Sequence, residues 1–374
     1  MLRIIDLTTL TGAYAARLFA EQGHEVIRVE PPEGDELRRL APMLGEQSDL
    51  EHGAYHQFLN AGKKSVALDV KSPEGQKYLL GLLGQADVLL VNIPLPLGES
   101  HCLTANPQLV LTKIVDDAPE LCAVARSGLM SLTGHPDQAP VTLGGHVPYM
   151  AVATCVAVAT AAALLVRNSS GRGLVATVSV RESLASFVEQ AMVEYSFSGT
   201  ITERRGSKGA ITAVSGALPC KDGHWVISQI HRPGRWSKFV QWVQDPELSA
   251  DASLAEEVNQ HKRRDFIMDR LRAWAGRFSK NELVEQAQEL HFPASPVSTP
   301  RDLVDDPQLL ARRFLTEMEH RDFGTIHFPQ GAIAGILGNR LGAAPKLGEH
   351  NAQILGNLKI GNAVGAKEFK QEFL

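Results

Sequence analysis

The first ninety residues alternate between short apolar runs and amphipathic segments. Residues 3–7 (RIIDL) and 25–30 (EVIRVE) are predicted as buried strands, with a helix at 14–23 (YAARLFAEQG) between them. Two more strands are predicted at 65–70 and 87–92. Because strands that alternate with helices build βαβ units, we expect a mostly parallel sheet with helices on both faces.

A helix start is predicted between the last two of these strands. Ser72 is placed to cap this helix, Pro73 takes its first position, and Glu74 lies near the positive end of its dipole. The strand at 65–70 is therefore expected to lead into a crossover helix.

The second half of the chain has a different pattern. A strand is predicted at 224–230 after the turn 221–223 (KDG), and residues 236–290 have helical periodicity. Another helix is predicted at 307–314, before a Gly-rich tail. A chain of 374 residues usually forms two domains, and this pattern predicts that the second is a smaller α/β domain.

The run from Met150 to Val166 raises the question of a membrane span. Its 17 residues are uncharged and near the lower limit for crossing a bilayer, and most are Ala, Val or Thr rather than Leu or Ile. Small residues allow close helix packing, so we predict a helix that is buried on all sides inside a large α/β domain. No membrane association is expected.

Composition and charge exclude several classes of protein. Hydrophobic residues make up 44% and charged residues 21%, and the net charge of −5 argues against an electrostatic nucleic-acid binder. The four cysteines form no CxxC pair, so neither a zinc site nor a disulfide framework is predicted. Asp6 interrupts the apolar start that a signal peptide needs. We expect a cytoplasmic protein without a metal site.

Common motifs for nucleotide and nucleophile sites are missing from the sequence. Residues 10–17 (LTGAYAAR) contain one glycine, so the GxGxxG fingerprint of dinucleotide binding is absent there. Neither a GxxxxGK[ST] phosphate loop nor a GxSxG nucleophile elbow occurs.

Six blocks of sequence together resemble the class III CoA-transferase family, also called CaiB/BaiF, which includes formyl-CoA transferase and carnitine CoA-transferase. Each block alone is a weak signal, but they occur in family order over nearly the whole chain. They are residues 5–38, 59–75, 86–92, 127–134, 293–314 and 345–350.

The resemblance implies a specific architecture. Two chains thread through each other as an interlocked dimer, each with a large doubly wound, Rossmann-like domain and a smaller α/β domain. It implies a large CoA-binding domain at 1–205, a smaller domain at 206–325, and a C-terminal segment at 326–374 that returns to the large domain. Coenzyme A or acyl-CoA enters as substrate, and no covalently bound cofactor is expected.

The resemblance also locates a departure from the family's chemistry. Relatives use an aspartate that attacks the acyl-CoA thioester, forming a mixed anhydride and then an enzyme-bound thioester. That aspartate follows a TG-x-PD-x-x-P loop, here 133–140, and its position falls on Tyr149. No Asp or Glu occurs from Gln138 to Arg181, and a phenol cannot form these acyl intermediates. We interpret Tyr149 as an inactive residue at the nucleophile position.

A second departure lies just upstream. The long Gly-rich loop of the relatives is replaced by the short connection 112–122, which a tolerated surface deletion would equally explain. Glu120 matches an acidic position that assists at the active site of some relatives, so it is a candidate acid or base. Alternatively, Glu120 only caps the helix that begins near Leu121. Asp116 and Asp117 are interpreted as turn residues.

The CoA pocket is expected to be only partly kept. Lys71 is a candidate phosphate ligand, although a surface lysine beside a helix start is the alternative interpretation. The basic residues usual near Pro31 and Ser100 are missing, so CoA binding should be weakened or re-routed. The positions that match the pocket of the relatives are Leu10, Thr11, Gly12, Leu68, Lys71 and Asn92.

The histidines form no predicted constellation. His135 and His146 are near the expected pocket in sequence, but loop histidines are more often polar surface groups. A racemase of the α-methylacyl-CoA type would need a histidine and an aspartate, and that aspartate falls at the same lost position. A racemase is therefore disfavoured.

Two classes of function stay open. In the first, the chain is the subunit of a heteromeric acyl-CoA:carboxylate CoA-transferase that lacks the aspartate. A paralogous second chain supplies it, as the resemblance to two-subunit benzylsuccinate CoA-transferases implies. In the second, it is a non-catalytic CoA-binding or scaffold homodimer, or a family member with a different acyl-CoA reaction. An acyl-CoA and a carboxylic acid are the expected small-molecule partners.

Overall fold

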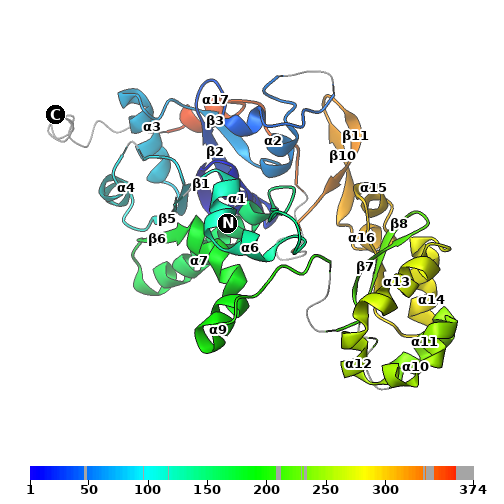
Figure 1. Ribbon diagram of the computed structural model, residues 1–374. Helices are drawn as coiled ribbons and strands as arrows, with labels where there is room; N and C mark the ends of the chain where they lie inside the picture. Colours follow the sequence, from blue (N-terminus) through cyan, green and yellow to red (C-terminus); the bar gives the residue numbers. More distant parts are fainter. Residues whose placement is uncertain are drawn as a thin grey trace. The chain divides into compact units, whose positions relative to one another are not determined.

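The computed structural model divides into two compact units, shown in Figure 1. The first unit contains residues 1–129, 143–190 and 308–374, and the second contains 130–142 and 191–307. The residues whose structure is described are 1–45, 49–95, 97–116, 118–207, 212–228, 230, 234–331, 333 and 341–358.

The expected division at 205/206 and 325/326 stays a prediction. The compact units have other bounds, because residues 308–325 belong to the first unit, whereas residues 130–142 and 191–205 belong to the second.

A six-stranded sheet forms the middle of the first unit, in the order β3-β2-β1-β4-β5-β6. Every neighbouring pair is parallel, which confirms the parallel sheet predicted from the sequence. The order reverses between β1 and β4, as in doubly wound folds. The strands are β1 (Arg3–Leu7), β2 (Glu25–Glu30), β3 (Lys64–Ala67), β4 (Val88–Val91), β5 (Val110–Val115) and β6 (Leu174–Ser179).

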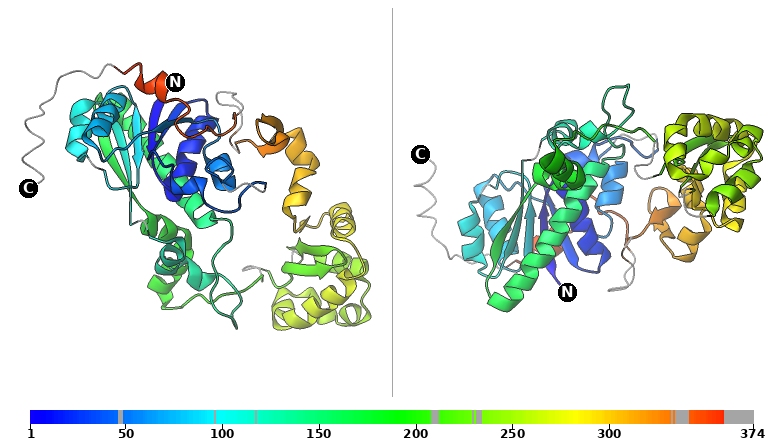
Figure 2. Two further views of the ribbon diagram at one scale, coloured as in Figure 1. Left: turned by 90° about the horizontal axis from the view of Figure 1, so that it is seen from above. Right: turned by 60° about the horizontal axis from the view of Figure 1, so that its bottom comes forward.

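Helices cover both faces of this sheet, as Figure 2 shows. Neighbouring residues of β5 point to opposite faces. Leu111 packs with Leu79 and Leu83 of α3 (Pro73–Leu83), together with Cys102 of α4 (Glu99–Ala105). Thr112 lies 2.9 Å, Oγ1 to Oγ1, from Thr160 of α7 (Val147–Ser170), which packs against α1 (Leu10–Glu21).

Shorter elements complete the first unit. They are η1 (Glu36–Arg38), α2 (Ala54–Leu59), α5 (Glu120–Arg126), α8 (Val180–Ala185), η2 (Ser186–Val188), α17 (Asn351–Leu355) and the hairpin of β10 (Leu315–His320) and β11 (Gly324–Pro329). Three helices cross a unit boundary in the sequence: α6 (Leu129–Leu132), α9 (Glu189–Ser198) and α16 (Pro307–Ala311).

Local signals in the sequence account for most element bounds. The predicted helix cap is confirmed, because Ser72 Oγ accepts the amide of Gly75 at 3.0 Å and Pro73 opens α3. The first helix begins at Leu10 rather than at the predicted Tyr14, so Gly12 lies inside the helix. A Cβ on Gly12 would come within 2.6 Å of Thr8 Cβ, so glycine permits close packing of helix on strand there.

The prediction that the apolar helix is buried on all sides is wrong. Helix α7 buries one face, including Val152, Val156 and Thr160, but Val158 and Leu165 on its other face are 65% and 71% exposed. Among the described residues, α7 is the one helix long and apolar enough to cross a membrane by length and composition. Because α7 lies against the sheet as the crossover between β5 and β6, it has the position of a covering helix of the fold (Figure 2).

The described C-terminal residues bind along β3, the edge strand of the sheet. Gly348 N donates to Ser65 Oγ at 3.0 Å, and His350 N donates to Ser65 O at 3.0 Å. The Asn351 side chain accepts the amide of Ala67 at 2.9 Å and donates to its carbonyl at 3.1 Å. This segment therefore satisfies backbone groups that an open sheet edge would leave exposed.

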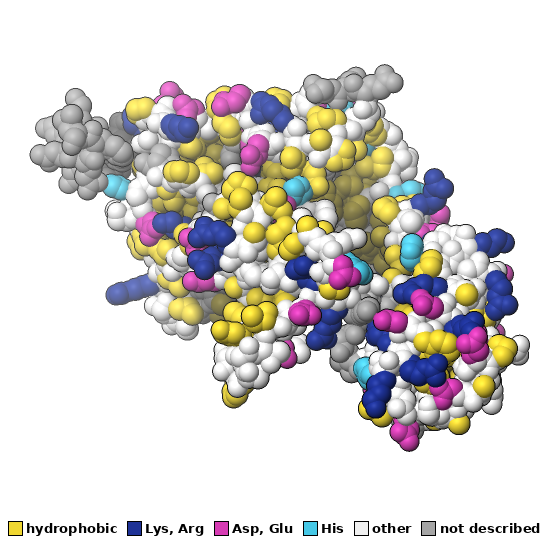
Figure 3. All heavy atoms as spheres, viewed as in Figure 1, with side chains coloured by type: hydrophobic (Ala, Val, Ile, Leu, Met, Phe, Trp, Pro, Cys, Tyr) yellow, Lys and Arg dark blue, Asp and Glu magenta, His cyan; other side chains and the backbone are white. Residues whose placement is uncertain are grey.

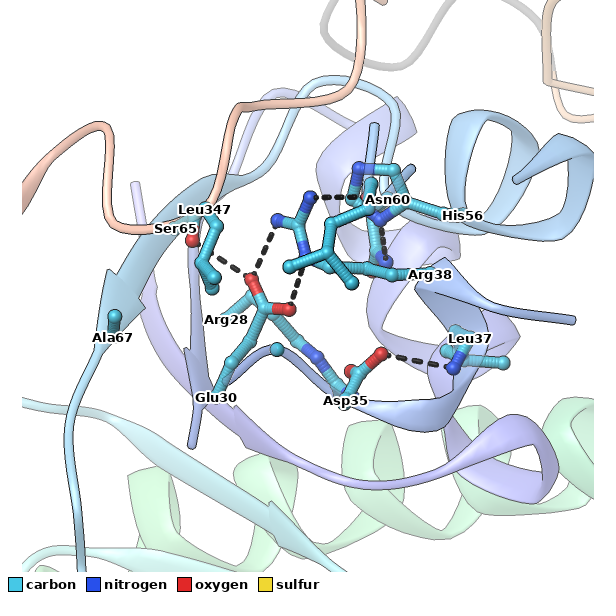
Figure 4. Close-up of polar contacts among 12 residues, drawn as sticks. Arg28, Glu30, Asp35, Leu37, Arg38, His56, Asn60, Ser65, Ala67 and Leu347 are labelled. Carbon is cyan, nitrogen blue, oxygen red and sulfur yellow. Dashed lines mark hydrogen bonds and ion pairs between the residues drawn. The ribbon is translucent and has the colours of Figure 1, made fainter. Parts of the chain in front are cut away.

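A buried ion pair lies under this segment. Arg38 donates to both carboxylate oxygens of Glu30, at 2.6 and 2.8 Å, and both side chains are fully buried. Figure 4 shows Arg38 between Glu30 and the side chains of His56 and Asn60, with Ser65 bound to Glu30 from β3. The pair joins the end of β2 to η1 and to β3.

The second unit contains a three-stranded antiparallel sheet of β7 (Gly216–Cys220), β8 (Gly223–Ile227) and β9 (Ala294–Pro296). Its core combines aliphatic side chains with Trp225, Trp236, Trp274 and two phenylalanines. All four tryptophans of the chain, residues 225, 236, 242 and 274, lie in this unit. Its helices are α10 (Arg235–Val243), α11 (Pro246–Ala250), η3 (Ala252–Ala255), α12 (Glu257–Lys262), α13 (Arg264–Ala275), α14 (Lys280–Glu289) and α15 (Pro300–Val304).

The buried ring of His56 predicts that the stability of the first unit depends on pH. Its Nε2 lies 3.2 Å from Pro345 O and its Nδ1 lies 3.0 Å from Asn60 Nδ2, an arrangement that suits a neutral imidazole. Burial and the charge of Arg38 lower the pKa of His56 from 6.5 to about 4. Between these pH values the unfolded chain binds a proton that the folded chain does not. The free energy of unfolding should therefore fall by up to about 3 kcal/mol as the pH drops from about 6.5 to about 4.

His56→Gln should remove most of this slope in urea unfolding followed by far-UV circular dichroism. Tryptophan fluorescence provides an internal control, because it reports the second unit and should show the same pH dependence in both proteins. An unchanged slope in the dichroism of the variant would contradict the assignment.

Candidate active site

The candidate site lies where the strands of the large sheet end and its helices begin. Thr9 follows β1 and Asn92 follows β4, on either side of the point where the strand order reverses. Thr9 N donates to Asn92 Oδ1 at 2.7 Å, and Asn92 Nδ2 donates to Thr9 Oγ1 at 2.6 Å. Open parallel sheets bind ligands outside the carboxyl ends of their strands at such a reversal.

A cleft of about 640 Å³ opens at this edge. Of the residues expected to bind CoA, Leu68 and Lys71 line the cleft, together with Thr9. Leu10, Thr11 and Gly12 are not among its described lining residues, and Thr11 and Gly12 are buried in α1 instead. The structure therefore brings Leu68 and Lys71 together but directs the other three into helix packing.

Most of the charges around this cleft are already paired. Arg28 lines it but binds Asp35 and Asp6, the latter at 3.0 Å. Burial would lower the pKa of the Arg28 guanidinium, but these carboxylates and Glu30 outweigh burial and raise it above its ordinary value. Lys71 is exposed and forms no ion pair within the described part of the chain. A phosphate-bearing ligand therefore meets one uncommitted cation and several carboxylates.

The carboxylates that line the cleft reinforce this contrast. Glu30 belongs to the buried pair with Arg38, whereas Glu33 and Glu36 are exposed, as is Asp69. Pro31 lines the cleft at the position where relatives are expected to carry a basic residue. This geometry agrees with the expectation that CoA binding is weakened or re-routed, which stays a prediction.

A second cleft, of about 690 Å³, lies beside the ends of β4 and β5 and is lined by Asn92, Ser100, Lys113 and Asp116 among others. Lys113 Nζ forms an ion pair with Glu99 at 2.8 Å. Asp116 adopts a left-handed conformation with a φ of 57° and accepts Ser179 Oγ at 2.7 Å, as suits the turn residue expected there. Asp117 lies outside the described residues.

Tyr149 lies in the first turn of α7 and is 6% exposed. Its hydroxyl donates a hydrogen bond to the carbonyl of Ala118, which precedes α5. The phenol therefore acts as a buried donor between two segments and presents no free nucleophile. That Tyr149 occupies the position of the relatives' aspartate stays a prediction.

Glu120 begins α5 and binds His146, the residue before α7. The carboxylate contacts Nδ1 of the imidazole, and the cap residue of α5 is Pro119, which makes no side-chain capping bond. The second oxygen of Glu120, Oε1, is buried and finds no partner among the described residues. Glu120 therefore belongs to a pair of titratable groups.

Reasoning from the sequence missed this pair, because 26 residues separate its members. The available local signal was 144-GGH-146, where two glycines precede the histidine. Gly145 and His146 both adopt left-handed conformations, with φ of 70° and 54°, and a non-glycine residue in this region is uncommon. The turn directs the His146 ring toward Glu120.

The other histidine considered, His135, lies in the second unit and is about half exposed. Its Nδ1 is 3.6 Å from the carboxylate of Asp137, a surface contact. No group of three or more His, Cys, Asp or Glu residues suited to a metal ion occurs in the part of the chain that the structure describes.

Comparisons with known proteins match nearly the whole chain. A family model described as "CoA-transferase family III" matches residues 2–351. The succinyl-CoA:mesaconate CoA-transferase of Haloarcula hispanica is 27% identical, over 98% of this chain and 98% of that protein. Subunit BbsE of the succinyl-CoA:(R)-benzylsuccinate CoA-transferase of Thauera aromatica is 28% identical, over 94% and 92%. A crystal structure of a CAIB/BAIF family protein from Brucella suis has a TM-score of 0.85 at 23% identity, over 96% and 98%.

Tyr149→Phe tests the role of the phenol. Loss of its hydroxyl leaves the Ala118 carbonyl without this donor, so the free energy of unfolding of the first unit should fall by about 1 kcal/mol. The rate at which the protein, alone or with a partner chain, reacts with acyl-CoA should not change, because the hydroxyl is not a nucleophile here. Urea unfolding followed by circular dichroism measures the first effect, with exposed Tyr195→Phe as the control. A folded Tyr149→Phe protein that has lost all reactivity would contradict this assignment.

Proposed function

Because the chain belongs to CoA-transferase family III, we propose that it is the subunit of an acyl-CoA:carboxylate CoA-transferase that lacks the nucleophilic carboxylate. A paralogous chain supplies the aspartate within an interlocked heteromer in the cytoplasm. The observation that carries this proposal is the segment from Gln138 to Arg181, which contains no Asp or Glu. Tyr149, the residue we place at the nucleophile position, is buried and bound to Ala118.

The chemistry explains why the missing acid matters. A carboxylate of the enzyme attacks the thioester carbonyl and the C–S bond breaks. CoA thiolate departs, and a mixed anhydride of the acyl group and the enzyme carboxylate is formed. The thiolate then attacks the enzyme's carbonyl carbon of the anhydride, which releases the first acid and forms an enzyme-bound CoA thioester. The acceptor acid attacks that thioester, and the same two steps in reverse order give the new acyl-CoA and the free enzyme carboxylate. Each step needs two carbonyl carbons joined through one oxygen. A phenol has no such carbon, so Tyr149 cannot replace the aspartate.

An exposed apolar face supports a partner chain. Val158 and Leu165 of α7 are 65% and 71% exposed, and Phe187, which precedes α9, is 52% exposed. Figure 3 shows hydrophobic side chains, in yellow, among the polar and charged ones at the surface. Large exposed apolar side chains on one helix face of the first unit mark a protein interface, and a paralogous subunit is the occupant we propose.

The similarity to named subunits supports the same arrangement. The chain matches BbsE, which by its name is one subunit of a transferase that uses succinyl-CoA, over nearly its full length. We propose a succinyl-CoA-type thioester as the donor class and a carboxylic acid as the acceptor. Lys71, Leu68 and Asn92 are our candidates for CoA contacts, and Glu120 is our candidate acid or base.

The first test is CoA exchange. The isolated chain, incubated with succinyl-CoA and a labelled acid, should give no labelled acyl-CoA above the buffer rate. A mixture with the aspartate-bearing paralogue should give exchange at ordinary enzyme rates. Tyr149→Asp should not rescue the isolated chain, because positioning contributes as much to the rate as the nucleophile does. Exchange by the isolated wild-type chain at enzyme rates would sink the proposal.

The second test addresses the interface. A Val158→Asp, Leu165→Asp double variant places two charges on the exposed face of α7, so it should lower the mass of the assembly in light scattering while the dichroism of the fold is kept. Asn168→Asp adds a charge on the same helix, and the assembly should stay intact. An unchanged mass for the double variant would show that this face is not the interface.

A further inference from the structure

Glu120 and His146 form a carboxylate–imidazole pair that engages one of the two ring nitrogens. Glu120 Oε2 binds Nδ1 of His146, so a neutral ring carries its proton on Nδ1 and leaves Nε2 as an acceptor. The His146 side chain is 28% exposed and that of Glu120 is 16% exposed. This is the arrangement in which a carboxylate orients a histidine to act as a general base.

Aromatic neighbours fix the plane of the imidazole. Tyr55 meets the ring edge-on, with centroids 5.0 Å apart and an interplanar angle of 66°. Tyr149 stacks on it at 6.5 Å and 15°. The φ of 54° at His146 adds backbone strain, which tends to persist where a side chain must be held for function. The ring is therefore held by contacts from α2, α5 and α7.

The pair lies at the edge of the sheet where a ligand is expected. Helix α5 follows β5, and α7 leads back to β6, so both helices begin at the carboxyl ends of these parallel strands. The positive end of the 24-residue α7 also favours the negative charge that develops on a thioester oxygen under attack. His146 is the residue immediately before that helix.

We propose that Glu120 and His146 form a general-base site that activates water for hydrolysis of an acyl-CoA thioester. His146 Nε2 accepts a proton from water as the water oxygen bonds to the acyl carbon. The C–S bond then breaks, and the same proton passes from Nε2 to the CoA sulfur. The products are a carboxylic acid and CoA, with no covalent enzyme intermediate. This inference rests on the proposed function only in taking the ligand to be an acyl-CoA.

In this scheme His146 is the catalytic residue and Glu120 is a positioning residue. The absence of a carboxylate from Gln138 to Arg181 favours water as the attacking group, because nothing in that segment can form an anhydride. The role of Glu120 is to hold the ring with Nε2 unprotonated.

Release of CoA by the isolated full-length chain tests the proposal. Succinyl-CoA, acetyl-CoA and benzoyl-CoA serve as probes, and free CoA is measured by chromatography because the chain has four cysteines of its own. The wild-type chain should hydrolyse at least one probe. His146→Asn should slow that hydrolysis by about 10²- to 10⁴-fold. His135→Asn removes an exposed histidine that also faces a carboxylate, and it should leave the rate unchanged.

The positioning role of Glu120 has its own readout. Glu120→Gln should lower kcat with little change in KM and should alter the acid limb of the pH–rate profile, whereas Glu120→Asp should recover part of the rate. Circular dichroism of each variant separates loss of the base from loss of the fold. His146→Gln provides a second replacement should His146→Asn fail to fold. Equal rates for folded His146 variants and wild type would overturn the proposal, as would hydrolysis of none of the three probes.

The outcomes also separate this inference from the transferase. If the isolated chain hydrolyses acyl-CoA but no aspartate-bearing paralogue restores CoA exchange, the transferase proposal fails and the general-base proposal stands. If the chain exchanges CoA together with a paralogue but hydrolyses no acyl-CoA by itself, the transferase proposal stands and the general-base proposal fails. A CoA adduct on Glu120 would overturn the water mechanism, because Glu120 would then be the nucleophile.

Discussion

The bidentate pair of Arg38 and Glu30 is the constraint on which the large unit depends. Both side chains are fully buried, so neither charge can be solvated if the other is removed. Burial would raise the pKa of Glu30, but Arg38, Arg28 and the Ser65 hydroxyl together outweigh burial and lower it, so the carboxylate stays charged at neutral pH. Breaking a buried pair typically costs about 3–5 kcal/mol. Arg38 also donates to the carbonyl of Pro345, which ties the returning C-terminal segment to the same point.

This constraint has a chemical consequence for the neighbouring cleft. Arg28 lines the cleft but is committed to Asp6 and Asp35, and the buried Arg38 is committed to Glu30, which also lines it. The cations that hold the fold together are therefore withheld from a phosphate-bearing ligand. Together with the missing nucleophile, this supports a division of labour in which a partner chain supplies what this chain lacks, while the separate Glu120–His146 pair offers a different chemistry.

The sequence predicted the parallel sheet and four of its six strands, β1 to β4, because their signals are local, whereas β5 and β6 were not predicted. Short β-rich runs with a capped helix at Ser72 specify strands and crossovers without reference to distant residues. The site was harder to predict, since Glu120 and His146 meet through a left-handed turn rather than through sequence spacing. The exposure of Leu165 was also missed, because an apolar helix looks the same in sequence whether its second face packs inside the chain or is left for a partner.

The most direct test of the account is to find which carboxylate carries the covalent intermediate. The heteromer is incubated with succinyl-CoA and reduced with borohydride, which converts an enzyme-bound thioester into an alcohol, and its peptides are mapped by mass spectrometry. The account predicts that the modified residue is the aspartate of the paralogous chain and that no peptide of this chain is changed. A reduced carboxylate in this chain, at Glu120 or at any other acid, would contradict it.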